Sequence, residues 1–144
     1  MLVARDEQLE ILKNIFGLKR GLHFMSYASP TSKQSKSTIR KDVSKQAIQK
    51  RIINDDFIFN KAKNYSEGDL EIEFTFGLSK RRYGKGKNDI DNLVKHALDC
   101  LKGILFKDDS QIKELHAKKF FVNSGVKQCT GIRIHKLSPN EVNK

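Results

Sequence analysis

The chain has 144 residues, of which 38% are hydrophobic and 31% charged, and its formal net charge is +11. This length fits one domain with a modest core, and the lack of any run of about 18 apolar residues predicts no membrane-spanning helix. The basic excess favours a polyanionic partner, either nucleic acid or an anionic membrane surface, although a requirement for solubility alone is the simpler alternative.

The first half of the chain predicts two helices and one strand. Apolar residues at helical spacing predict a helix over residues 5–16, within an added N-terminal segment over residues 1–20. Residues 21–28 favour a strand, and residues 31–38 form a loop that has no apolar content. A second helix is expected over residues 41–53. Four of its apolar side chains should face the core: Val43, Ala47, Ile48 and Ile52.

The second half holds the clearest strand and the clearest helix. Residues 69–79 alternate apolar with polar side chains, and residues 91–105 carry an apolar arc opposite a charged one. Residues 111–122 and 126–137 predict two closing strands joined by a hairpin-type turn, before a loose tail at 138–144. We therefore expect one domain over the whole chain, of α+β class, with a small, mainly antiparallel sheet and helices packed on one of its faces.

Basic residues are concentrated in two segments. Residues 33–51 contain seven lysines and arginines against one acid, Asp42. Residues 80–87 contain no acid and carry Lys80, Arg81, Arg82, Lys85 and Lys87. Such clusters favour contact with nucleic acid over a merely solvated surface, although either segment alone is a weak signal.

Three aspartates and a lysine form the clearest chemical pattern. Asp89 and Asp91 come directly before a predicted helix, Lys95 follows one turn later, and Asp109 precedes the next strand. Two carboxylates about 5 Å apart, at an effective dielectric of about 20, repel each other by roughly 3 kcal/mol, which a divalent cation would offset. Mg²⁺ prefers oxygen ligands and keeps positions open for water and phosphate oxygens. The pattern is therefore typical of a metal site that acts on phosphates.

Each part of this pattern also has a purely structural interpretation. Asp91 could cap the helix, Lys95 could be its ordinary partner one turn along, and Asp109 could belong to a turn. Capping requires only one aspartate, however, so two on the same side of the chain favour the metal site.

The histidines and cysteines give weaker signals. The four histidines lack the close spacing of a zinc site: His23, His96, His116 and His135. We expect His96 on the solvated side of its helix. Cys100 and Cys129 suggest neither a disulfide framework nor a cysteine zinc site, and the N-terminus lacks the pattern of a secretion signal. Reduced thiols in a cytoplasmic protein are the expectation.

The acidic pattern belongs to a longer motif between residues 88 and 119. Its matching parts are Asp89-Ile90-Asp91-Asn92-Leu93-Val94-Lys95, Leu98-Asp99, Asp108-Asp109-Ser110-Gln111 and residues 115–119. This composite closely resembles the RusA family of Holliday junction resolvases, densely over about a fifth of the chain. Members of that family are Mg²⁺-dependent, homodimeric endonucleases, often phage-derived, that nick four-way DNA junctions.

The resemblance implies a RusA-like fold and a role for each matching residue. The implied metal-binding catalytic acids are Asp89, Asp91 and Asp109, and the implied catalytic lysine is Lys95. The implied supporting residues are Asn92, Asp99, Asp108 and Gln111. Mg²⁺ is the implied metal, with Mn²⁺ as a substitute. DNA contact is expected from Lys80, Arg81, Arg82, Lys85, Lys87, Lys118 and Lys119.

Together these observations predict an Mg²⁺-dependent endodeoxyribonuclease that resolves four-way junctions by paired phosphodiester hydrolysis, in DNA recombination and repair. A homodimer is expected from the resemblance. Two alternatives stay open. One is a less selective metal nuclease that acts on branched or duplex DNA. The other is a non-catalytic, basic nucleic-acid-binding protein whose acids only cap a helix and shape turns.

Overall fold

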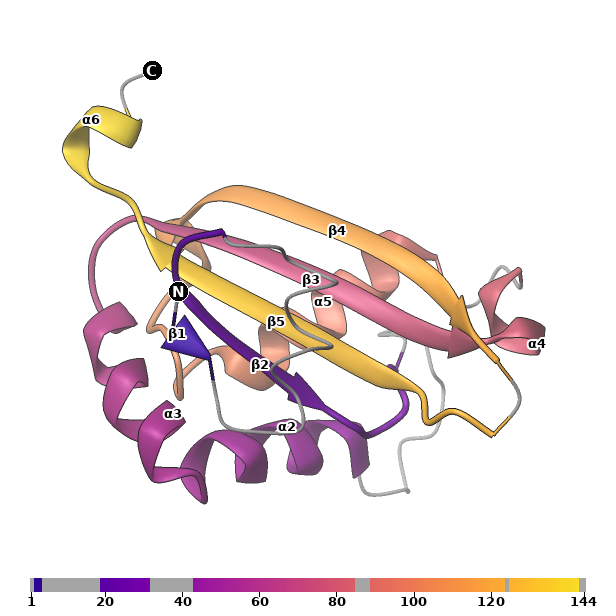
Figure 1. Cartoon of the computed structure of the whole chain (residues 1–144). Coiled ribbons are helices and arrows are strands. Elements are labelled where there is room, and N and C mark those ends of the chain that lie inside the picture. Colours follow the sequence, from indigo (N-terminus) through magenta and orange to yellow (C-terminus); the bar gives the residue numbers. More distant parts are fainter. Residues whose placement is uncertain (1, 4–18, 32–42, 85–88, 124, 143–144) are drawn as a thin grey trace.

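A five-stranded sheet with helices on one face makes up the fold (Figure 1). The computed structural model describes residues 2–3, 19–31, 43–84, 89–123 and 125–142. The strand order is β1-β2-β5-β3-β4, so β4 forms one edge of the sheet. The predicted α+β class is confirmed.

Helices and strands are mixed along the chain. The strands are β1 (Leu2–Val3), β2 (Leu22–Ser26), β3 (Leu70–Ser79), β4 (Ile112–Val122) and β5 (Cys129–Lys136). The α-helices are α2 (Val43–Ile53), α3 (Asp56–Ala62), α4 (Lys80–Tyr83), α5 (Ile90–Leu101) and α6 (Pro139–Val142). Two short 3₁₀ turns complete the list, η1 (Lys63–Tyr65) and η3 (Asp109–Gln111). The predicted helix over residues 5–16 lies outside the described residues, as do residues 32–38 of the predicted loop.

The strand pairing differs from the expected hairpin. β3 pairs antiparallel with β5 and parallel with β4, and β5 also pairs antiparallel with β2. Two of the three ladders between the longer strands are therefore antiparallel, as predicted. The expected hairpin between the two closing strands is wrong, because β3 lies between β4 and β5. The middle of β3 is buried on both faces, so it is the strand that takes a central position.

The parallel pairing of β3 with β4 makes the intervening chain a crossover through α4 and α5, since parallel strands cannot be joined by a tight turn. Leu70 lies beside Ile112 at the start of both strands, and Ser79 lies beside Val122 at their ends. Residues that follow β3 and residues that precede β4 therefore lie at opposite ends of the sheet. This single fact determines how the predicted acids are distributed.

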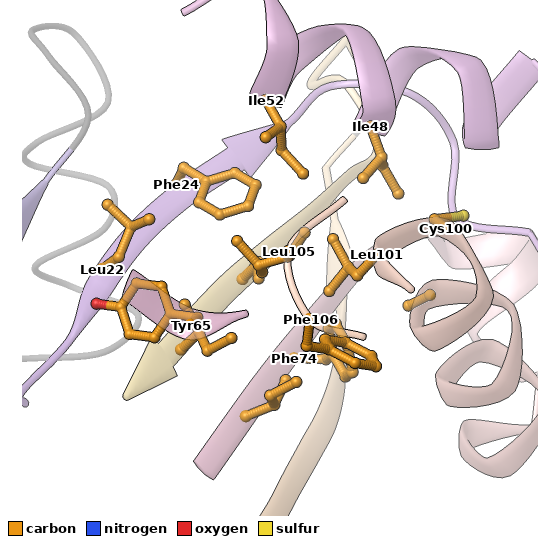
Figure 2. Close-up of a cluster of buried hydrophobic side chains, with 14 of the residues drawn as sticks. Leu22, Phe24, Ile48, Ile52, Tyr65, Phe74, Cys100, Leu101, Leu105 and Phe106 are labelled. Carbon is orange, nitrogen blue, oxygen red and sulfur yellow. The ribbon is translucent and has the colours of Figure 1, made fainter. Parts of the chain in front are cut away.

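The core lies between the sheet and the helices (Figure 2). The even positions of β3 are buried there, against Ile48 and Ile52 of α2 and the apolar arc of α5. Burying each such side chain contributes about 1.5–3 kcal/mol. The prediction that Val43 faces inward is wrong, since it is 69% exposed, and Ala47 is only half-buried. At about 100° per residue, Val43 lies opposite Ile52 on the helix.

Three further details of the crossover differ from the sequence predictions. α5 ends at Leu101 instead of residue 105, because Lys102 turns extended and Gly103 takes a φ of 87°. His96 is buried rather than solvated: it lies about 40° from Cys100 around the helix, and its Nδ1 is 3.6 Å from that sulfur. Residues 80–83 form a helical turn in place of a loop.

Candidate active site

Asp89 and Asp91 lie at the start of α5, with exposed side chains. Asp89 is the N-cap residue, and its carbonyl accepts hydrogen bonds from the N–H groups of Asn92 and Leu93, both at 3.1 Å. Its carboxylate makes no capping hydrogen bond, although its position would allow one. The capping interpretation therefore accounts for neither carboxylate: the N-cap is Asp89 rather than Asp91, and it caps through its backbone alone.

Lys95 lies one turn after Asp91 on the same solvent-facing side of α5. Its Nζ is 4.0 Å from Asp91 Oδ2, and the two side chains are 63% and 69% exposed. A pair this long and this exposed contributes little to stability. The opposite side of the helix carries Leu93 and Ala97, both buried in the core, which fixes the orientation of the three charged side chains toward solvent.

Asp108 and Gln111 build the turn that holds Asp109. The Gln111 Oε1 accepts hydrogen bonds from the backbone N–H groups of Lys107 (2.8 Å) and Asp108 (3.0 Å), while its Nε2 donates to the Gly68 carbonyl at 3.0 Å. The Asp108 carboxylate caps η3, and hydrogen bonds from Ser110 hold its pKa below the ordinary value. These two residues from the motif therefore have a clear structural task.

Asp109 lies at the far end of α5 from Asp89 and Asp91. Its Oδ2 is 3.8 Å from the Nζ of Lys102, the C-cap residue of α5. The twelve residues of α5 make a helix about 18 Å long. Within one chain Asp109 is therefore not brought together with Asp89 and Asp91. The cause is the parallel crossover, which returns the chain to the opposite end of the sheet before β4 begins.

The remaining motif residues on α5 are less exposed. Asn92 is buried, with 4% of its surface accessible, and Asp99 is half-buried. Both lie behind the exposed side of the helix, so they can support it without facing solvent fully.

The basic residues gather at the end of the sheet that leads into Asp89. Lys80 and Arg81 are exposed on α4, and Lys119 Nζ donates a hydrogen bond to the Tyr83 carbonyl at 2.9 Å. Lys118 points to the other face of the sheet, since it is the neighbour of Lys119 on β4. Lys80, Arg81 and Lys119 therefore form a positive surface at the end of the sheet from which the chain leads into α5. Lys85 and Lys87 lie outside the described residues.

Arg82 differs from its neighbours because its guanidinium contacts protein. It donates hydrogen bonds to the Gln128 side chain, at 3.2 Å, and to the Pro30 carbonyl. Burial lowers its pKa. Arg82 therefore connects α4 to the two loops beside it, a structural task that the sequence did not indicate.

Two exposed aromatic residues lie at the same end of the sheet as α4, and no functional role was predicted for either from the sequence. Tyr83 and Phe121 form an edge-to-face contact with ring centroids 5.9 Å apart, and they are 39% and 54% exposed. Lys119 Nζ lies 5.3 Å from the Tyr83 ring centre. Exposed rings beside cations can stack on unpaired bases. Tyr83 could have been found from its place inside the basic segment, whereas Phe121 looks like an ordinary strand residue in the sequence.

The sequence model of the family described as Endodeoxyribonuclease RusA matches residues 19–134. The chain belongs to this family. The match includes α4, both acidic segments and all but the last two residues of β5. RusA-family proteins are nucleases that are generally dependent on a divalent metal and act on branched DNA. No curated protein matches the chain. Among the helices that the structure describes, none is long and apolar enough to cross a membrane.

Proposed function

We propose that this chain is an Mg²⁺-dependent endodeoxyribonuclease that cuts four-way DNA junctions in the cytoplasm, in recombination and repair, with Mn²⁺ able to replace Mg²⁺. One observation supports this function above all others: a chain of the RusA family presents two exposed carboxylates and a lysine at the start of α5, beside a basic surface. The basic surface would attract a polyanion such as DNA and so bring its phosphates close to the two carboxylates.

Asp89 and Asp91 would hold the metal ion. Their exposed oxygens suit a hard cation that keeps positions open for water and phosphate. When bound, such an ion activates a water molecule and neutralises charge on the phosphate. Lys95 would stabilise negative charge as the phosphodiester bond breaks, and its exposed ammonium leaves room for DNA to approach.

Asp109 can join this site only from a second copy of the chain. The exposed side of α5 has Asp91 at one end and Lys102, paired with Asp109, at the other. Two such helices set antiparallel would bring Asp109 of each chain toward Asp91 of its partner, and Lys102 beside Asp109 would offset part of the repulsion between the two carboxylates. A two-fold homodimer of this kind has two identical sites, which suits the cutting of two like strands across a junction.

Cleavage of a synthetic four-way junction tests the proposed activity. Purified protein should nick the junction when Mg²⁺ is added and not when it is withheld, and it should leave a linear duplex of the same sequence intact. Equal cutting of the duplex would favour the less selective nuclease. Binding without cutting in either Mg²⁺ or Mn²⁺ would overturn the proposal in favour of a non-catalytic binding protein.

Mixing two inactive variants tests the shared site. Asp91→Asn and Asp109→Asn should each prevent cleavage alone, but the mixed dimer contains one site in which every aspartate is intact. We expect that mixture to regain nicking of one strand per junction, measured on denaturing gels with each strand labelled in turn. If wild-type protein cuts the junction but the mixture stays inactive, or if Asp109→Asn alone cuts normally, the partner does not supply Asp109.

A further inference from the structure

A second group of metal-ligating side chains lies on the sheet face opposite the described core helices α2 and α5. Glu71 of β3 is directly opposite Glu114 of β4, and His116 follows two residues later on the same face. One oxygen or nitrogen atom from each of the three lies within 4.8 Å of the other two. Within the part of the chain that the structure describes, no other group of three such residues comes this close.

The neighbours of Glu71 fix its carboxylate in place. Arg133 Nη1 donates to Glu71 Oε1 at 3.0 Å, and His116 Nε2 lies 3.2 Å from Oε2. Burial opposes ionisation of Glu71, but the hydrogen bond and charge of Arg133 hold its pKa below the ordinary value. Arg133 therefore orients the Glu71 carboxylate without itself binding metal, as neighbouring side chains do in many metal sites.

Charged side chains surround the group on both strands. Glu71, Glu73 and Glu114 face Arg133 and Lys19, which contact Glu73 at 2.9 Å and 3.2 Å respectively. Glu71 and Glu114 also repel each other, since like charges directly opposite on neighbouring strands are destabilising. A cation between the two strands would relieve this repulsion.

We propose that Glu71, Glu114 and His116 form a binding site for Zn²⁺ or a similar divalent transition-metal ion, which connects β3 to the edge strand β4. An imidazole with two carboxylates suits Zn²⁺ better than Mg²⁺, which prefers oxygen ligands alone. Zinc bonds of about 2.0–2.2 Å place neighbouring donor atoms roughly 3.3 Å apart in a tetrahedron. The 3.2 Å between His116 Nε2 and Glu71 Oε2 already fits that spacing.

This site is separate from the acids of α5. β3 turns its odd-numbered residues, including Glu71, away from the core, whereas α5 packs on the opposite face of the sheet. The ligands on β4 are exposed, so an ion can enter from solvent and a water molecule can fill the fourth position. The site is therefore suited to holding the edge strand in place rather than to the proposed cleavage reaction.

Calorimetric titration with Zn²⁺ tests the site, using protein with Asp91→Asn so that the acids of α5 contribute less. We expect one Zn²⁺ per chain and a raised melting temperature when it binds. Glu114→Gln and His116→Ala should each weaken binding more than about tenfold. Both side chains are exposed, so neither change should unfold the protein.

Glu67→Gln is the matched control, since Glu67 is an exposed glutamate whose partner is Lys107 rather than the proposed ligands. It removes the same charge as Glu114→Gln and should leave Zn²⁺ affinity unchanged. Visible absorption of bound Co²⁺ provides a second readout, which should lose intensity with His116→Ala. The proposal is overturned if wild-type protein takes up no Zn²⁺, or if Glu114→Gln and His116→Ala bind it as well as Glu67→Gln does.

Discussion

Replacing Asp91 by asparagine is expected to slow junction cleavage on the order of a thousandfold while junction binding stays the same or tightens. The change removes one negative charge and keeps nearly the same shape. Asp91 is exposed in the first turn of α5, and its distance of 4.0 Å from Lys95 indicates a weak pair, so the fold should be unaffected. Loss of a repulsive charge next to DNA explains why binding should not weaken.

The measurement is single-turnover cleavage of a four-way junction, with binding followed by fluorescence anisotropy in Ca²⁺. Asp56→Asn is the matched control, because Asp56 is also an exposed acid in the first turn of a helix, at the start of α3. It should cut at the wild-type rate. Cleavage by Asp91→Asn within a few fold of that control would remove Asp91 from the catalytic group.

Replacing Arg133 by alanine should destabilise the fold by about 3–5 kcal/mol, because it removes the buried cation that Glu71 and Glu73 share and leaves Glu73 with Lys19 alone. Arg133 is 2% exposed and donates to Glu71, to Glu73 and to the Arg20 carbonyl. A loss of that size is a large part of the stability of a typical domain. The midpoint of urea denaturation gives the measurement, with circular dichroism as the probe.

Lys107→Ala is the control for Arg133→Ala. The Lys107 Nζ lies 3.0 Å from Glu67, the same distance as Arg133 to Glu71, but both members of the Lys107–Glu67 pair are exposed. Only the buried pair should matter, so Lys107→Ala should leave the denaturation midpoint unchanged. If Arg133→Ala and Lys107→Ala lower the denaturation midpoint equally, burial of Arg133 does not explain its contribution to stability.

The effect of Arg133 should also depend on pH. Glu71 has a lowered pKa in the folded protein, so its contribution to stability is present above its unfolded pKa and is lost as the pH falls through its folded pKa. In Arg133→Ala the carboxylate loses that partner, and its folded pKa should rise instead. The stability deficit of the variant should therefore shrink as the pH is lowered. A constant deficit from neutral to acidic pH would contradict this account.

Local patterns in the sequence predicted the local structure well. The alternation over residues 69–79 gave the central strand, and the apolar arc before Cys100 gave the helix that carries Asp91. The errors concern packing. His96 is buried because the protein covers a wider arc of α5 than the polar residues around His96 indicated. The two closing strands, β4 and β5, do not pair because β3 lies between them.

The sequence by itself determined which residues carry charge and that Asp89 and Asp91 stand together, since neighbours along a chain stay neighbours in the fold. Only the tertiary structure decided where Asp109 lies, because a parallel crossover sends the chain to the other end of the sheet. It also brought His116 to Glu71, 45 residues earlier in the chain, through the register of two strands. Strand register depends on burial across the whole sheet, and residue spacing does not record it.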